Sequence, residues 1–232
     1  MIDLSPAEIE ALGLSLRIAF WATLCSLPPG IAVAWLLARR DFPGKAMFDA
    51  LVHLPLVVPP VVVGYVLLVV LGRTGPVGRW LFETFGLTLG FSWRGAAVAA
   101  AVMAFPLMVR AIRLSLEAVD QRLEDAARTL GAGPVSVFLT VTLPLTAPGL
   151  VAGAILGFAR SLGEFGATIT FVSNIPGETR TLPIALYTFT QTPDGEMAAL
   201  RLVLISAAVA FAALAASEII ARRVRQRIGA AS

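Results

Sequence analysis

The sequence predicts an all-α integral membrane protein, and its composition and charge pattern support this fold class. Of the 232 residues, 57% are hydrophobic and only 14% are charged, and the mean hydropathy is +0.83. A soluble domain carries about 25% charged residues, so this chain cannot cover a globular surface with charge. Long runs free of Asp, Glu, Lys and Arg recur along it, as helices that cross a bilayer require. The single cysteine excludes a disulfide-stapled fold, because it has no partner within the chain.

These runs place the expected membrane-spanning helices in chain order. Ile18–Ala38 and Ala50–Gly72 are each long enough to supply the ~20 residues that cross ~30 Å of hydrocarbon. Gly95–Val109 is shorter, but an arginine flanks it at each end, and these side chains can extend towards the headgroups. The last span covers Ala198–Ala221, with one charged residue near each end.

The fourth span comes from the charge-free run Thr129–Ala159, which is too long for one crossing. Its first part, up to Val141, is expected to lie outside the membrane. The helix is expected to start near Leu143 and Pro144, because proline is tolerated in a first helical turn. We therefore expect one domain, 1–232, with five spans over residues 14–38, 48–72, 92–112, 143–161 and 198–221.

Two further apolar stretches, Phe165–Gly177 and Thr181–Pro193, are too short to span and are interrupted by glycine and proline. Such stretches predict re-entrant or interfacial segments. The alternative is an ordinary external loop that contains two amphipathic helices.

The basic residues predict the orientation. With five spans the termini lie on opposite sides, and eleven of the eighteen basic residues fall on the side of the carboxyl terminus. Positive residues accumulate on the cytoplasmic side, so we expect the amino terminus outside and the carboxyl terminus inside. The tail Arg222–Arg227 is expected to rest on anionic membrane lipid. Because the other basic residues are scattered along the chain, no nucleic-acid partner is expected. The cytoplasmic set is Arg39, Arg40, Lys45, Arg110, Arg113, Arg122, Arg128, Arg222, Arg223, Arg225 and Arg227.

Prolines are dense within the expected spans, and each interior proline removes a helical hydrogen bond. For any single proline, a packing kink is an adequate explanation. As a set they favour a mobile protein that forms a pathway, because broken helices are typical of transporters. The set is Pro28, Pro29, Pro55, Pro59, Pro60, Pro106, Pro144 and Pro148.

The segment Arg110–Gly149, between the third and fourth spans, predicts a short amphipathic helix exposed to the cytosol. Glu124 and Arg128 are four residues apart and are expected to form a favourable surface pair. Gly131 is expected to end the helix. A partner protein could bind such a helix, although a solvated connecting helix would have the same pattern.

This segment also resembles the coupling motif of ABC importer permeases. That motif reads EAA, three residues, G, nine residues, I, one residue, LP, and every spacing is kept here. The chain departs from it by Asp for Glu and by Val for Ile, which preserve charge or shape. The resemblance implies a coupling helix over about 122–133 and these coupling residues: Glu124, Asp125, Ala126, Ala127, Gly131, Val141, Leu143 and Pro144.

The resemblance extends over nearly the whole chain and is closest to the molybdate permeases within the binding-protein-dependent transport system inner-membrane component family. His53–Tyr65, Phe91–Glu117 and Phe158–Pro183 carry it. Related sulfate permeases share the GEFGA core at Gly163–Ala167, so tungstate or sulfate remains an alternative substrate. The resemblance implies the fold of a type I ABC importer transmembrane domain with a cytoplasmic coupling helix.

The family resemblance also implies the partners. Two permease copies form the pathway, two ABC ATPase subunits bind ATP and Mg, and a periplasmic molybdate-binding protein delivers the oxyanion. The complex would lie in the bacterial inner membrane. This chain contains no GxxxxGK[ST] phosphate loop, so it is expected to be non-catalytic and to hold no cofactor or metal of its own.

The stretch Phe158–Pro183 is expected to form part of a gate that faces the binding protein. Neutral donors suit an anion that must be released, and a charge pair between Arg160 and Glu164 would cancel rather than attract. The alternative is that this stretch only packs a dimer interface. The candidate pathway residues are Arg160, Ser161, Glu164, Thr168, Thr170, Ser173 and Asn174.

Other classes of protein are less consistent with the sequence. A secondary carrier would need titratable residues in mid-span, and Ala50–Gly72 and Gly95–Val109 contain no acidic residue. A membrane scaffold would not explain the motif spacing. His53 has no neighbouring cluster that would suggest metal ligation, and Cys25 is expected to be a small core residue.

Overall fold

The computed structural model describes residues 5–193 and 195–229, and within these ranges every regular element is helical. The side chains of the expected lipid-binding tail, Arg222–Arg227, lie outside the described part. The elements in chain order are α1 (Pro6–Arg39), α2 (Lys45–Val57), α3 (Pro60–Leu71), α4 (Pro76–Phe85), α5 (Trp93–Glu117), α6 (Gln121–Thr129), α7 (Pro134–Val137), the π-helical turn η1 (Phe138–Thr142), α8 (Leu143–Leu162), α9 (Gly166–Val172), α10 (Leu182–Thr190) and α11 (Glu196–Gly229).

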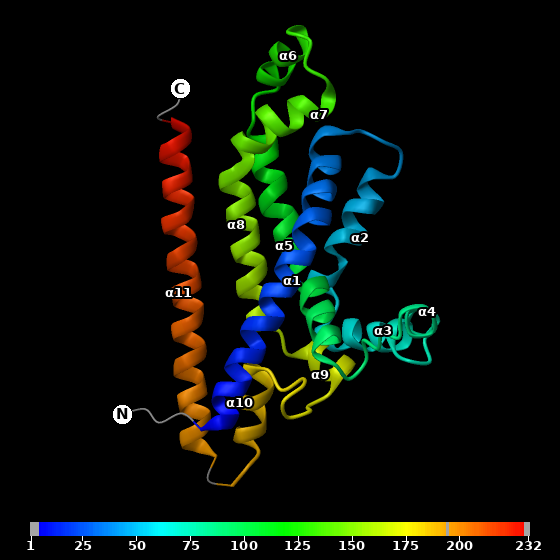
Figure 1. Ribbon diagram of the computed structural model, residues 1–232, viewed down its shortest axis with the longest axis vertical. Helices are drawn as coiled ribbons and strands as arrows, with labels where there is room; N and C mark the ends of the chain where they lie inside the picture. Colours follow the sequence, from blue (N-terminus) through cyan, green and yellow to red (C-terminus); the bar gives the residue numbers. More distant parts are fainter. Residues whose placement is uncertain (1–4, 194, 230–232) are drawn as a thin grey trace.

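Four continuous helices within the described residues are long and apolar enough to cross a membrane: Pro6–Arg39, Trp93–Glu117, Pro134–Leu162 and Glu196–Ala216. A fifth crossing is present if α2 and α3 are counted together. Helices α1 and α11 stand lengthwise in the bundle, and α1 begins at the end opposite to the one where α11 ends (Figure 1). The expected all-α membrane fold is therefore confirmed. We call the two ends the α6 end and the α10 end.

The expected span 48–72 is not one straight helix. Helices α2 and α3 meet at 111°, and with 13 and 12 residues neither alone supplies a full crossing. Val58 and Pro59 between them have extended ψ values, and Pro60 opens α3 at a position where its missing N–H breaks no helical bond. Helix α3 consequently turns sideways out of the bundle and leads to α4 (Figure 1).

The fourth spanning helix starts earlier than the sequence suggested. It is helical from Pro134 through α7, η1 and α8, and not from Leu143. Pro134 occupies the first turn, where proline is well tolerated. Pro144 has no N–H for the carbonyl oxygen four residues earlier, and the π-helical turn lies directly before it.

The core is formed where α5 packs between α1 and α8. Helix α5 buries alanines, including Ala96, Ala99, Ala100 and Ala104, so the neighbouring backbones approach closely. Helix α8 contributes glycine at every fourth position against α5, namely Gly149, Gly153 and Gly157. A β-carbon at Gly153 would lie 2.9 Å from Cγ1 of Ile112.

Polar contacts fasten α1 to the later elements at the α10 end. The Ser5 hydroxyl and the Glu8 carboxylate form a capping box at the start of α1. The buried Glu8 carboxylate also accepts a bond of 2.9 Å from Nε of Arg201 in α11. The Ser15 hydroxyl accepts a bond of 2.7 Å from the backbone N–H of Leu182 in α10.

Candidate functional site

Helix α6 forms a projection at one end of the molecule, beyond the ends of α5 and α8 (Figure 1). The Asp120 side chain caps its start by accepting a bond of 2.9 Å from the N–H of Arg122. The helix ends at Thr129, four residues before the expected end at 133, because the chain reverses at Gly131. Gly131 has φ +89°, which only glycine adopts without strain, so its predicted role in ending the helix is confirmed.

The outer face of this projection is exposed and mixed in character. Asp125 has a side chain that is 66% exposed, and its carboxylate lies 2.7 Å from Nη1 of Arg128. Leu130 is 88% exposed, and Leu123 and Val135 are also largely exposed. Exposed apolar side chains beside charges are typical of a surface that binds another protein.

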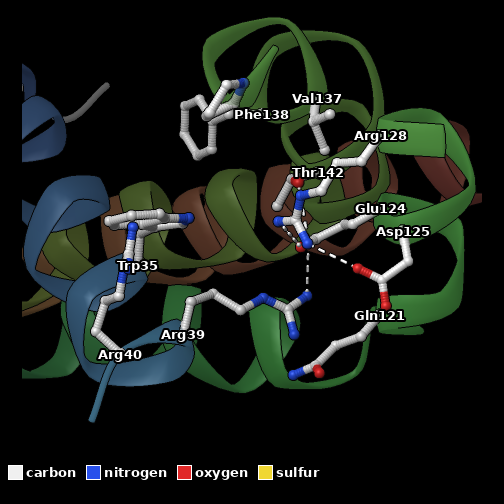
Figure 2. A pocket seen from close by; sticks show the side chains of 11 residues that line it. Trp35, Arg39, Arg40, Gln121, Glu124, Asp125, Arg128, Val137, Phe138 and Thr142 are labelled. Carbon is white, nitrogen blue, oxygen red and sulfur yellow. Dashed lines mark hydrogen bonds and ion pairs between the residues drawn. The ribbon is translucent and has the colours of Figure 1, made fainter. Parts of the chain in front are cut away.

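Glu124 points the opposite way, into the molecule. Of the nine residues of α6, all of which the structure describes, Glu124 alone is buried. Its Oε1 accepts bonds of 2.9 Å from Nη2 of Arg39 and 2.9 Å from the hydroxyl of Thr142 (Figure 2). The predicted pair with Arg128 is present, with 3.6 Å between its Nη2 and Oε2 of Glu124. Glu124 is nevertheless buried and not on the surface, and its shorter contacts come from α1 and η1.

A cavity of about 440 Å³ opens beside this network, between the end of α1, helix α6 and the turn η1. The side chains of Trp35, Phe138 and Arg40 lie on its α1 and η1 sides, as Figure 2 shows. Nε of Arg39 is buried and has no hydrogen-bond partner among the described residues. The joint between α6 and the bundle is thus polar and loosely filled, unlike the alanine-rich core.

The remaining motif residues lie where α7 continues into α8. Val141 belongs to η1 and is half-buried, and Leu143 and Pro144 form the first turn of α8. The motif therefore spans both α6 and the start of a membrane helix. Ala126 and Ala127 lie on the exposed and half-exposed faces of α6.

The predicted pairing of Arg160 with Glu164 is confirmed, with 2.7 Å between Nη1 and Oε2. The Glu164 carboxylate is buried and also accepts a bond of 2.8 Å from the N–H of Ala167, at the start of α9. Ser161 and Thr168 are buried as well. Glu164, Ser161 and Thr168 are thus buried at the junction of α8 and α9, whereas the side chain of Arg160 is 28% exposed.

The other pathway candidates are more accessible. Thr170 is half-buried and its hydroxyl donates to the carbonyl of Gly166, while Ser173 is exposed. Asn174 donates to the hydroxyl of Thr188 and accepts from Nε of Arg180. The seven candidates therefore do not converge on one site, and their role in a pathway stays a prediction.

Sequence reasoning missed several residues of these networks. Arg39 was interpreted only as a cytoplasmic flank, and Thr142 was not singled out. The pairing of Glu8 with Arg201 was also missed, although Ser5-Pro6-Ala7-Glu8 has the spacing of a capping box. Within the described residues no three His, Cys, Asp or Glu side chains form a group that could hold a metal ion.

The arrangement of the helices matches solved transporters. A bacterial ABC transporter that imports the acidic polysaccharide alginate superposes with a TM-score of 0.75 at 17% identity, over 95% of this chain and 80% of the other. Inward-facing MetNI, a methionine ABC transporter, superposes with a TM-score of 0.69 at 18% identity, over 94% of each chain. The fold is that of a type I ABC importer transmembrane domain.

The chain belongs to the family of binding-protein-dependent transport system inner membrane components, whose model matches residues 30–226. It is similar to the molybdenum transport system permease protein ModB of Escherichia coli K12, with 63% identity over 97% of this chain and 99% of that protein. The corresponding protein of Haemophilus influenzae is 56% identical over 96% of this chain and 97% of that protein. The chain is thus a multi-pass membrane component of a transporter.

Proposed function

We propose that this chain is the permease subunit of an ATP-driven molybdate importer in the bacterial inner membrane. The observation that carries the proposal is the 63% identity, over nearly the full length of both chains, to a molybdenum permease. A sulfate permease protein of Chlorokybus atmophyticus is less similar, at 37% over 80% of this chain. Molybdate is therefore the favoured substrate over sulfate.

The α6 end is the proposed cytoplasmic end. Basic side chains gather there at the ends of α1 and α5 and on α6, as the positive-inside rule requires of a cytoplasmic face. The α10 end would then face the periplasm and receive the molybdate-binding protein. Two copies of the chain would form the pathway, because isologous pairing is the commonest closed symmetry.

Helix α6 is the proposed docking site for the ATPase subunits, which would bind ATP and Mg and carry out hydrolysis. The exposed carboxylate of Asp125 and the apolar side chains of Leu123 and Leu130 support this role. Asp125→Arg reverses the charge of the docking surface, and Asp125 is linked to Glu124 through their shared neighbour Arg128 and not through Arg39 or Thr142. We expect it to abolish ATPase binding and uptake while the protein stays in the membrane; uptake at the wild-type rate would contradict the docking role.

Reconstitution tests the function as a whole. The permease and its ATPase subunit are reconstituted in proteoliposomes together with the binding protein. Uptake of molybdate, tungstate and sulfate is then measured with and without ATP. We expect uptake that requires ATP and prefers molybdate. Preference for sulfate would overturn the substrate, and uptake driven by a proton gradient alone would overturn the class of transporter.

The gate is proposed to include Phe158–Pro183, which lies towards the α10 end of the bundle (Figure 1). Helix α9 packs against α3, directly after the bend between α2 and α3, so movement at the bend would reach α9. Changing Thr168 and Thr170 to valine removes two hydroxyls from this helix. We expect reduced uptake in membranes where the complex is intact; unchanged uptake would remove these residues from the pathway.

A further inference from the structure

Helix α6 is attached to the bundle without an apolar anchor. All nine of its residues are described, and the side chain it buries is the carboxylate of Glu124. Surface helices are ordinarily held by an apolar stripe on their inner face. Here Leu123 points outwards and is exposed, so hydrogen bonds and charge determine how α6 sits on the bundle.

The carboxylate of Glu124 joins two helices that are far apart in the chain. Arg39, the last residue of α1, donates to its Oε1, and the same guanidinium nitrogen lies 3.3 Å from the carbonyl of Val119, just before α6. Thr142, the last residue of η1, donates to Oε1 from the other side. The side chains of Arg39 and Glu124 are each only 8% exposed. In such a position a hydrogen-bonded pair is strong, and removing one partner leaves a buried charge.

We propose that Glu124 is a positioning residue that passes movement of α6 to two membrane helices at once, to α1 through Arg39 and to α8 through Thr142. This inference rests on the proposed docking of an ATPase at α6. Asp125 would meet the ATPase, whereas Glu124 would transmit the displacement inwards. Thr142 closes a π-helical turn, and such turns interrupt the regular ladder of a helix, so this is the place where the start of α8 can be shifted.

Glu124→Gln tests the inference in the complete importer in proteoliposomes. The amide keeps the size and one acceptor but removes the charge that holds Arg39. We expect molybdate uptake per ATP hydrolysed to fall by about tenfold, within the usual range of coupling between sites. The ATPase should still copurify with the permease and hydrolyse ATP. Thr142→Val, which keeps the ion pair and the side-chain volume, should lower the ratio in the same direction by less.

The matched control is Asp41→Asn, which also changes a carboxylate to an amide near the end of α1. Asp41 pairs with Lys45 on the surface, outside the network, and the control should leave uptake per ATP unchanged. The double variant Arg39→Gln with Glu124→Gln should lose no more than Glu124→Gln alone, because the pair acts as one unit. Unchanged uptake per ATP in both Glu124→Gln and Thr142→Val would overturn the inference, as would loss of the ATPase from Glu124→Gln.

A separate readout distinguishes failure of this inference from failure of the proposed substrate. Spin labels are attached to cysteines that replace exposed Leu130, directly after α6, and exposed Phe20 in α1, with Cys25 changed to serine. The distance between the labels is measured with and without ATP. The distribution of distances between the labels should be narrow in the wild-type protein and broader in Glu124→Gln. A complex that shows this difference but takes up no molybdate would contradict only the assignment of molybdate as substrate. Equal distributions in both proteins would contradict the positioning role of Glu124.

Discussion

Adjacent carboxylates on α6 have opposite surroundings. Asp125 is exposed and pairs with Arg128 on the helix surface, whereas Glu124 is buried and pairs with Arg39. The sequence motif marks both positions as one functional unit, and only the fold separates them. A charge change at Asp125 therefore tests partner binding, and a charge change at Glu124 tests the attachment of α6.

The direction of Glu124 could not be derived from the sequence. The amphipathic pattern of α6 does not indicate its inner face, because Leu123 is exposed and Glu124 is buried. Arg39 also lies 85 positions earlier in the chain. The i,i+4 spacing favoured Arg128 as the partner, because neighbours on a helix surface are the pairs that a local pattern predicts. The long-range donor Arg39 makes the shorter contact, at 2.9 Å against 3.6 Å for Arg128.

The Glu8 carboxylate carries the contact between α1 and α11. Glu8→Gln removes the charge that accepts from Arg201 and weakens the capping box with Ser5. We expect a loss of about 2 kcal/mol, because hydrogen bonds to charged groups contribute about 1.5–3 kcal/mol each. The thermal unfolding midpoint in detergent should fall accordingly.

The matched control is Glu10→Gln, two residues further along α1, where the side chain is exposed. It should leave the midpoint within the scatter of the wild type. Equal midpoints for Glu8→Gln and Glu10→Gln would show that the bond to Arg201 contributes nothing to stability.

At the level of helices, the contact of α8 with α5 depends on small residues. Gly149, Gly153 and Gly157 follow each other at intervals of four and so lie on one face. A β-carbon at Gly153 would lie 3.1 Å from the carbonyl oxygen of Met108, which is backbone and cannot rotate away. The packing of these helices is therefore set by backbone approach, as is usual in membranes.

Gly153→Ala should destabilise the protein by about 1–3 kcal/mol, because overpacking a close contact forces the helices apart. Gly13→Ala is the matched control: it lies in α1, and a β-carbon there would have no atom within 4 Å. The control should be neutral or stabilise by about 0.5–1 kcal/mol, since alanine favours a helix over glycine. A Gly153→Ala protein with the unfolding midpoint of the Gly13→Ala protein would contradict this account of the contact.

The bend between α2 and α3 shows where prediction of elements from charge-free runs stops. The charge-free run Ala50–Gly72 correctly indicates apolar helical segments, since it contains all of α3 and most of α2. Prolines at 59 and 60 make a break plausible, but interior prolines at 28 and 29 leave α1 continuous. The difference lies in packing: α3 is held sideways by α9, and a β-carbon on Gly64 would lie 2.9 Å from Cα of Ala167. Its two partners are about a hundred residues apart, so no local sequence pattern indicates the contact.

For the molecule as a whole, the sequence predicted the fold class, four of the spanning helices and a helix that ends before Gly131. Each of these depends on composition or on a motif with fixed spacing. It did not predict the polar contacts that join distant helices, because the partners are separated by many residues and either partner alone resembles a membrane flank. The described end of α11 lies at the same end of the molecule as α6, and α1 begins at the opposite end, which agrees with an odd number of crossings (Figure 1).

The proposed orientation predicts which end reacts with a membrane-impermeant thiol reagent. Leu130→Cys lies directly after α6 at an exposed position, and Ile175→Cys lies on the loop after α9. With the permease expressed alone, Ile175→Cys should be labelled from the periplasm and Leu130→Cys only after the inner membrane is opened. The native Cys25 is exposed on α1, so the expectation that it is a core residue is wrong. It should still not react in either case, because it lies within the first span and a thiolate needs water to form. The reverse pattern would invert the orientation.

The bond between Glu8 and Arg201 also bears on how the chain is completed during synthesis. Its partners are 193 positions apart, so α1 is made and inserted long before α11 emerges. Until then the carboxylate of Glu8 has no arginine to meet it, and α1 remains incompletely packed at that end. Packing of α1 at this end is therefore completed only when α11 has been made. In a nascent chain that ends before Arg201 this bond is missing, and the Glu8 carboxylate keeps its capping-box bond with Ser5.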